Sequence, residues 1–210
     1  MNSATDPRTV VLVHGLWWGS WSMGLVGRRL RADGFDVHAF GYPTMRRSLR
    51  AHAKALRDFI KGLNLDQVDL VGHSLGGLVI LRMLDEYADL PPGRVVLLGS
   101  PVNGSAVGRR VADRSLFRPL VGQARTALED GFSHAPAGRD TGVIAGSRPV
   151  GIGRIFGPLD SPNDGTVSVA ECRLEGASEC ILPVTHTGLV TAPVVGKAVA
   201  AFLGTGSFPD

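Results

Sequence analysis

Residues 68–77 read VDLVGHSLGG, and this stretch decides the fold. Val68 to Val71 form a short, mostly apolar run that is typical of a buried strand, and residues 77–87 continue as an apolar helix. Between them, Gly72 and Gly76 flank Ser74 at a spacing that lets the backbone turn tightly without a Cβ clash. A strand-to-helix turn of this kind pushes the serine Oγ out above the end of a parallel sheet.

The bare Gly-x-Ser-x-Gly pattern is a weak signal by itself. In a chain with 28 glycines, composition alone predicts roughly 0.24 matches by chance. The single match here follows an apolar strand directly and opens an apolar helix, which is the setting that the chemistry requires. We therefore interpret Ser74 as a nucleophile, and a plain strand-to-helix turn is the alternative.

Apolar runs alternate with amphipathic stretches along the rest of the chain, which indicates an α/β fold with a mostly parallel central sheet and helices on both faces. The expected strands are residues 9–13, 35–40, 68–71, 94–98, 141–145 and 180–184. The expected helices are residues 20–32, 49–63, 77–87 and 190–203. The helical spacing over 20–32 predicts that one apolar face is formed by Trp21, Leu25, Val26 and Leu30.

At 210 residues the chain suits a single domain over 1–210. Between residues 101 and 140 the pattern weakens, and this segment is expected to form a small lid or an excursion over the site. The N-terminus has no secretion signal and no apolar run approaches the ~20 residues of a membrane span, so we expect a cytoplasmic protein without stable membrane insertion.

The net charge of +3 comes with scattered arginines, so no nucleic-acid partner is expected. The oligomeric state is left open. Cys172 and Cys180 are interpreted as unpaired thiols in a reducing compartment, although they can pair if the chain is exported. No cluster of cysteine and histidine has zinc spacing, and no metal site is expected.

In serine-turn enzymes on such a sheet, an acid and then a histidine follow the nucleophile along the chain. His134 lies in the irregular segment, too early in this order, whereas His186 follows the last expected strand on a loop. For the acid we favour Asp164, which the tight Asp164-Gly165 turn can hold against the histidine, over Asp160. The predicted catalytic residues are therefore Ser74, Asp164 and His186.

The oxyanion of acyl transfer needs backbone N–H donors. Leu75, at the start of the helix after the serine, is one expected donor, and the loop after the first strand supplies the other from Leu16, with Trp17 as second choice. Trp17 and Trp18, together with Trp21, either line an apolar groove for the acyl chain or pack that helix against the body. Both interpretations stay open.

These motifs together resemble the α/β-hydrolase superfamily, and most closely its compact bacterial lipases and esterases with a small cap or none. The segments that carry the resemblance are His14-Gly15-Leu16, residues 72–77, residues 163–167 and His186-Thr187-Gly188-Leu189. The resemblance spans nearly the whole chain and implies hydrolysis of a small-molecule carboxylic ester or lipid through an acyl-enzyme, without any cofactor. The irregular segment from Val102 to Asp140 departs from this pattern, because it is longer than a minimal lipase needs.

Two other kinds of function fit the same residues. The predicted triad can transfer the acyl group to another acceptor, or cleave a thioester or an amide. Alternatively, the chain is a ligand-binding protein on a catalytically silent hydrolase fold. Product analysis with competing nucleophiles separates the first alternative from ester hydrolysis. Binding of an ester analogue without turnover indicates the second.

Overall fold

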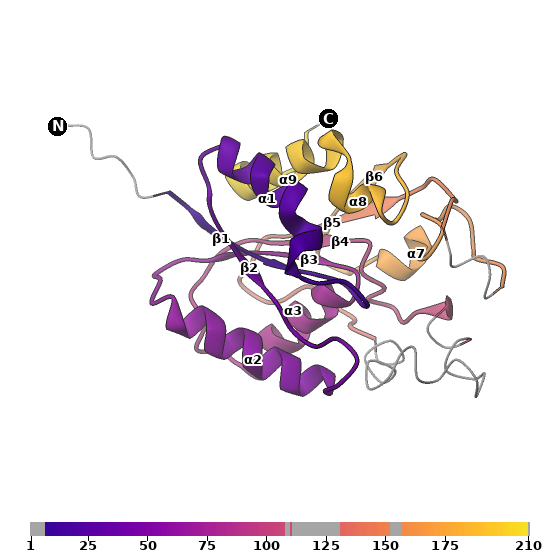
Figure 1. The fold of residues 1–210 in the computed structure, drawn as a ribbon. Coiled ribbons are helices and arrows are strands. Elements are labelled where there is room, and N and C mark those ends of the chain that lie inside the picture. Colours follow the sequence, from indigo (N-terminus) through magenta and orange to yellow (C-terminus); the bar gives the residue numbers. More distant parts are fainter. Residues whose placement is uncertain (1–6, 108–109, 111–130, 152–156, 210) are drawn as a thin grey trace.

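The computed structural model describes residues 7–107, 110, 131–151 and 157–209 (Figure 1). Its centre is one six-stranded sheet in the order β2-β1-β3-β4-β5-β6, in which every neighbouring pair is parallel. The strands are β1 (Thr9–Val13), β2 (Asp36–Phe40), β3 (Asp69–His73), β4 (Val95–Leu98), β5 (Thr141–Gly146) and β6 (Ser178–Leu182). The predicted α/β fold class is confirmed.

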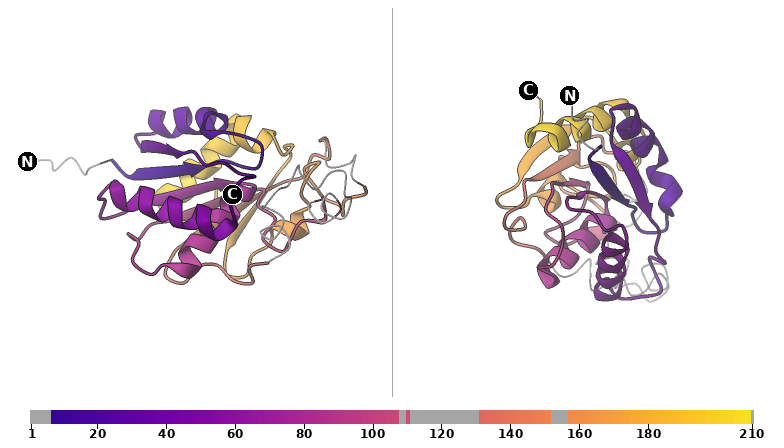
Figure 2. Two further views of the ribbon diagram at one scale, coloured as in Figure 1. Left: turned by 60° about the horizontal axis from the view of Figure 1, so that its bottom comes forward. Right: turned by 90° about the vertical axis from the view of Figure 1, so that its left-hand side faces the viewer.

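Helices cover both faces of this sheet, as Figures 1 and 2 show. On one face lie η1 (Ser20–Met23), α1 (Gly24–Ala32), α8 (Gly188–Thr191) and α9 (Pro193–Thr205). On the other lie α2 (Leu49–Gly62) and α3 (Leu75–Glu86), and the short α7 (Val169–Cys172) packs near β5. Because the strands are covered on both sides, β1, β3, β4 and β5 are buried at every residue.

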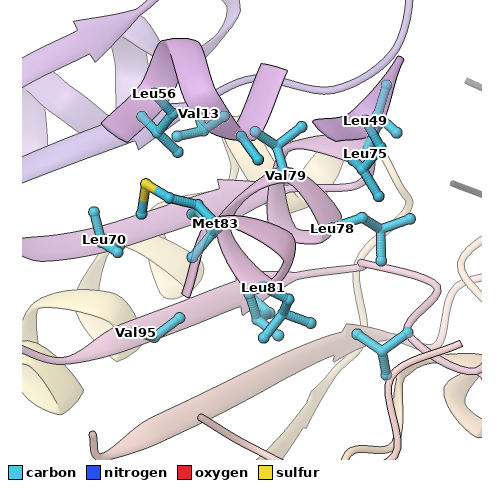
Figure 3. Close-up of a cluster of buried hydrophobic side chains, with 14 of the residues drawn as sticks. Val13, Leu49, Leu56, Leu70, Leu75, Leu78, Val79, Leu81, Met83 and Val95 are labelled. Atoms are coloured by element: carbon cyan, nitrogen blue, oxygen red, sulfur yellow. The ribbon is translucent and has the colours of Figure 1, made fainter. Parts of the chain in front are cut away.

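The core under α2 and α3 holds the nucleophile turn in place. Figure 3 shows side chains of α3, among them Leu78 and Met83, between the strands and α2. Each fully buried side chain of this size contributes about 1.5–3 kcal/mol relative to exposure. Leu75, directly after Ser74, is only 1% exposed, so the first turn of α3 is anchored by packing.

The first expected helix differs from its sequence pattern. It begins as the 3-10 turn η1 and continues as α1. The prediction that Trp21 and Leu25 face the core is wrong, because their exposed fractions are 72% and 38%. The buried face is instead formed by Met23, Val26, Gly27 and Leu30.

The closing segment also differs, since it forms two helices rather than one. Ala192 between α8 and α9 is extended (φ −73°, ψ 136°), because a residue before proline is driven out of the helical region and Pro193 follows it. The last strand ends at Leu182, two residues earlier than expected. His186 therefore lies on a short loop between β6 and α8.

The two cysteines do not form a disulfide. Cys172 packs into the core on the α2 and α3 side together with Val143. Cys180 pairs in register with Ile144, which belongs to the core on the α1 and α9 side. The two thiols thus lie on opposite faces of the sheet. The lid expected over 101–140 lies largely outside the described residues.

Candidate active site

Ser74 stands between β3 and α3 in a strained backbone conformation, with φ 53° and ψ −122°. A non-glycine residue in such a region costs about 1–3 kcal/mol, and this strain is characteristic of functional turns. The Ser74 amide donates a 2.9 Å hydrogen bond to the Leu98 carbonyl, which fixes the turn to β4. A Cβ on Gly76 would collide with the Val13 carbonyl oxygen, so the glycine permits the close approach of α3 to β1.

The position of this turn in the sheet also indicates a ligand-binding site. The strand β3 lies between β1 and β4, and the chain runs outward from β1 to β2 on one side and from β3 to β4 on the other. Ligands of open parallel sheets bind at such a switch point, beyond the carboxyl ends of the strands. Ser74, His186 and the loop that begins at His14 all follow the carboxyl ends of strands.

His186 and Asp164 form a short, shielded pair. His186 Nδ1 lies 2.6 Å from Asp164 Oδ2, and the side chains are 15% and 1% exposed. The other carboxylate oxygen, Oδ1, accepts hydrogen bonds from the amides of Thr166 (2.9 Å) and Val167 (2.7 Å). The His186 amide donates to the Asp164 carbonyl at 2.9 Å. Four contacts thus orient the imidazole through one aspartate and its turn.

Gly99, which follows β4, leaves the room that this pair occupies. A Cβ at Gly99 would lie 3.2 Å from both Asp164 Oδ2 and His186 Nδ1, and 2.5 Å from Leu189 Cδ1. Gly99 also has a φ of 55°, which favours glycine. The requirement for glycine here is therefore both steric and conformational.

His73, the residue before Ser74, connects the turn to His186. Its ring centroid lies 4.7 Å from that of His186, and its Nε2 is 3.2 Å from the His186 carbonyl oxygen. Burial and, to a lesser degree, the neighbouring His186 hold the pKa of His73 well below its usual value. Its Nε2–H donates to that carbonyl, and the lowered pKa disfavours a second positive charge beside His186.

The loop after β1 approaches the serine from the other side. A Cβ on Gly15 would lie 3.0 Å from Ser74 Cβ. The Trp17 amide donates to Thr44 Oγ1 at 3.3 Å, and Trp17 has a φ of 65°. Within the described part of the chain the Leu16 amide meets no acceptor, so Leu16 rather than Trp17 has an amide available to a ligand. The Leu75 amide begins α3, where the first helical N–H groups lack partners within the helix.

The tryptophans after this loop are partly exposed. Trp17 is 44% exposed and Trp18 is 37% exposed, and the Trp18 and Trp21 ring centroids lie 5.4 Å apart. Partial exposure fits both interpretations of the cluster, an acyl groove and packing of the helix start, and both stay open.

Asp160 and His134, the alternatives that the sequence offered for the acid and the base, form contacts elsewhere, and His14 is structural. Asp160 is exposed, and its carbonyl accepts a bond from Asn163 Nδ2. His134 is exposed and pairs with Glu175 at 3.1 Å. His14 is buried and accepts the Tyr42 amide on Nε2, so it ties the loop after β1 to the loop after β2.

A groove of about 780 Å³ lies elsewhere, between the C-terminal half of α3 and residues 131–139. Its lining includes none of Ser74, Asp164 and His186, and it begins two turns of helix beyond Ser74. We therefore do not assign the chemistry to it.

Sequence reasoning missed Thr44 and Gly99. A signal existed for Gly99, since it ends a strand at the same edge of the sheet as Ser74. Thr44 gave none, because its contact with Trp17 joins two loops that are 27 residues apart.

Comparison with known proteins defines the class. The model of the alpha/beta hydrolase family matches residues 10–199, and the chain belongs to this family. An uncharacterized protein of Mycobacterium tuberculosis is 25% identical over 244 residues, covering 95% of this chain and 70% of that protein. A carbendazim hydrolyzing esterase of Nocardioides sp. is 34% identical over 90 residues, which is 37% of this chain and 36% of the esterase.

Among solved structures, a metagenomic carboxyl esterase superimposes with a TM-score of 0.70 at 17% identity, covering 98% of this chain and 73% of the esterase. At this level of identity the likeness concerns the fold.

Proposed function

We propose that this protein is a serine hydrolase that cleaves carboxylic esters, with Ser74 as nucleophile, His186 as general base and Asp164 as the residue that orients it. The observation that carries the proposal is the 2.6 Å pair of His186 and Asp164, buried beside a strained serine turn. Gly99 leaves space for the pair of His186 and Asp164, and the lowered pKa of His73 disfavours a second positive charge beside His186. Both features support a histidine that gains and loses a proton.

The mechanism follows from these contacts. His186 takes the proton of Ser74 as Oγ attacks the ester carbonyl, and the amides of Leu16 and Leu75 stabilise the oxyanion. The protonated imidazole is stabilised by Asp164 and then donates its proton to the leaving alcohol. Water, activated by the same histidine, releases the acid and frees Ser74. We propose that Trp17 and Trp18, which are exposed beside this loop, contact the acyl chain.

Labelling with a fluorescent fluorophosphonate tests the activation of Ser74. We expect covalent labelling of the wild type, none of Ser74→Ala, and unchanged labelling of Ser178→Ala, an exposed serine at the start of β6. Absence of labelling in the wild type would support the silent scaffold instead.

Substrate class needs a second measurement. Matched esters, thioesters and amides with the same acyl group, assayed with and without an added alcohol acceptor, separate hydrolysis from acyl transfer. Ester hydrolysis exceeding the other reactions is the expected result, and faster transfer to the alcohol than to water would indicate an acyltransferase.

A further inference from the structure

Large apolar side chains are exposed around the loop that precedes the candidate site. We call them the apolar rim, and its members are Trp17, Trp18, Trp21, Leu25 and Met45. Their exposed fractions range from 37% to 72%, whereas every other large apolar residue of the first three strands and their helices is partly or fully buried. An exposed cluster of this kind marks a surface that another phase or molecule covers.

The rim draws its residues from two neighbouring loops. Trp18 and Trp21 are in ring contact, and Leu25 lies about one helical turn after Trp21 on the same exposed face. The hydrogen bond from the Trp17 amide to Thr44 places the residue before Met45 against the tryptophan loop. The rim therefore joins the segment after β1 to the segment after β2, two neighbouring strands.

Basic residues are concentrated in the two segments that carry the rim, where Arg50, Lys54 and Arg57 pair with Glu86, Asp58 and Asp89. Residues 14–32 and 41–57 contain seven arginines and one lysine but no aspartate or glutamate. The rest of the chain, with the other 14 basic residues and all 19 acidic ones, is net negative. Arg28, Arg46 and Arg47 are exposed, and none of them forms an ion pair within the residues that the structure describes.

We propose that the apolar rim with Arg28, Arg46 and Arg47 docks the protein on an anionic lipid surface, with Ser74 facing that surface. Tryptophan is favoured at the boundary between headgroups and acyl chains, and arginines beside it attract anionic headgroups. The docked loop is the one whose Gly15 lies against Ser74, so a lipid surface can supply an ester to the site. A protein seated on the same rim would cover this approach to Ser74.

The description of the surface as a source of substrate rests on the proposed function, but docking itself requires no catalysis. Within the described residues no helix is long and apolar enough to cross a membrane, so the contact would be peripheral. It would also weaken with salt, because its charged part is exposed.

Co-sedimentation with vesicles tests the docking in the Ser74→Ala protein, so that no lipid is hydrolysed. Vesicles of phosphatidylcholine mixed with phosphatidylglycerol are expected to bind the protein far more tightly than phosphatidylcholine alone, and less tightly as salt is added. Arg46→Gln with Arg47→Gln is expected to weaken this binding about 25-fold, or about fivefold for each arginine. Trp21→Ser with Leu25→Ser is expected to weaken it about tenfold or more.

Two controls change similar residues away from the rim. Ile181→Ser removes an exposed apolar side chain on β6, at the other edge of the sheet, and Arg173→Gln removes an exposed arginine. Both are expected to leave vesicle binding unchanged. Equal binding to neutral and anionic vesicles, equal losses in the controls, or a rim that instead joins two copies of the chain in solution would overturn the proposal.

The rim variant Leu25→Ser is also assayed in the Ser74-containing protein on a water-soluble ester, where an unchanged rate is expected. Vesicle binding without any fluorophosphonate labelling would contradict the proposed function and leave docking intact. Labelling without vesicle binding would contradict docking alone.

Discussion

Replacing Asp164 with asparagine tests how the pair of His186 and Asp164 works. Oδ1 of Asp164 accepts two backbone amides, from Thr166 and Val167, so an asparagine must keep its carbonyl oxygen at that position. Its NH₂ group then takes the place of Oδ2 and faces His186 Nδ1, 2.6 Å away in the wild type. Two donors cannot share this contact, and the imidazole shifts its proton to Nε2.

A histidine with its proton on Nε2 cannot accept the proton of Ser74. The loss of a correctly oriented base of this kind lowers kcat by about 10⁴-fold, or about 5.5 kcal/mol of transition-state stabilisation. The fold changes little, because the side chains are nearly the same size, and we expect to lose only about 1–2 kcal/mol of unfolding free energy.

Steady-state kinetics on a soluble ester, with urea unfolding alongside, gives both quantities. The matched control is Asp160→Asn, an exposed acid four residues earlier in the same loop, which is expected to keep wild-type kcat. The reasoning is refuted if Asp164→Asn retains a kcat within about tenfold of the wild type while folded, or if Asp160→Asn loses as much.

Three further predictions concern the surroundings of the pair. Gly99→Ala adds a Cβ 2.5 Å from Leu189 at a positive φ, so we expect it to lower the unfolding free energy by about 2–4 kcal/mol and kcat about 100-fold. The control Gly138→Ala, also at a positive φ but with open space around it, is expected to lose about 1 kcal/mol and no activity. Thermal melts and steady-state kinetics measure both. Thr44→Val removes the acceptor of the Trp17 amide and is expected to lower kcat about tenfold with little change in KM. Thr44→Ser keeps the hydroxyl and is expected to restore kcat, whereas an unchanged kcat in Thr44→Val would contradict a positioning role. Burial lowers the pKa of His14, His52 and His73 from 6.5, so the unfolded chain binds more protons than the folded one below about pH 6.5. The free energy of unfolding therefore decreases as the pH is lowered, by up to about 1.4 kcal/mol per pH unit for each histidine. Urea titrations at about pH 7.5 and about pH 5.5 measure this difference.

The sheet was largely predictable from sequence, because buried parallel strands are short apolar runs with distinct ends. Residues 9–13 form β1 as expected, and the other strands begin or end within two residues of their patterns. The first helix was not predictable in its orientation. Its pattern allowed two apolar faces, and only packing of Met23 and Leu30 against the sheet decides which is buried.

The candidate site was predictable where one short segment carries the information. Ser74 is marked by its turn, and Asp164 by the glycine after it. Contacts between distant segments leave no pattern in the sequence. His73 contacts His186, 113 residues away, and Thr44 contacts Trp17, 27 residues away. Such contacts depend on the arrangement of loops above the sheet, which periodicity does not specify. The break before α9 has its cause in Pro193, which drives Ala192 out of the helical region.

Intact mass spectrometry of the protein mixed with an activated ester tests the central claim most directly. If Ser74 is the nucleophile, a transient adduct with the mass of the acyl group appears, maps to the peptide that contains Ser74, and is absent from Ser74→Ala. The Asp164→Asn protein should acquire it far more slowly. Turnover of the ester without any adduct on this peptide, or the same adduct in Ser74→Ala, would contradict the account.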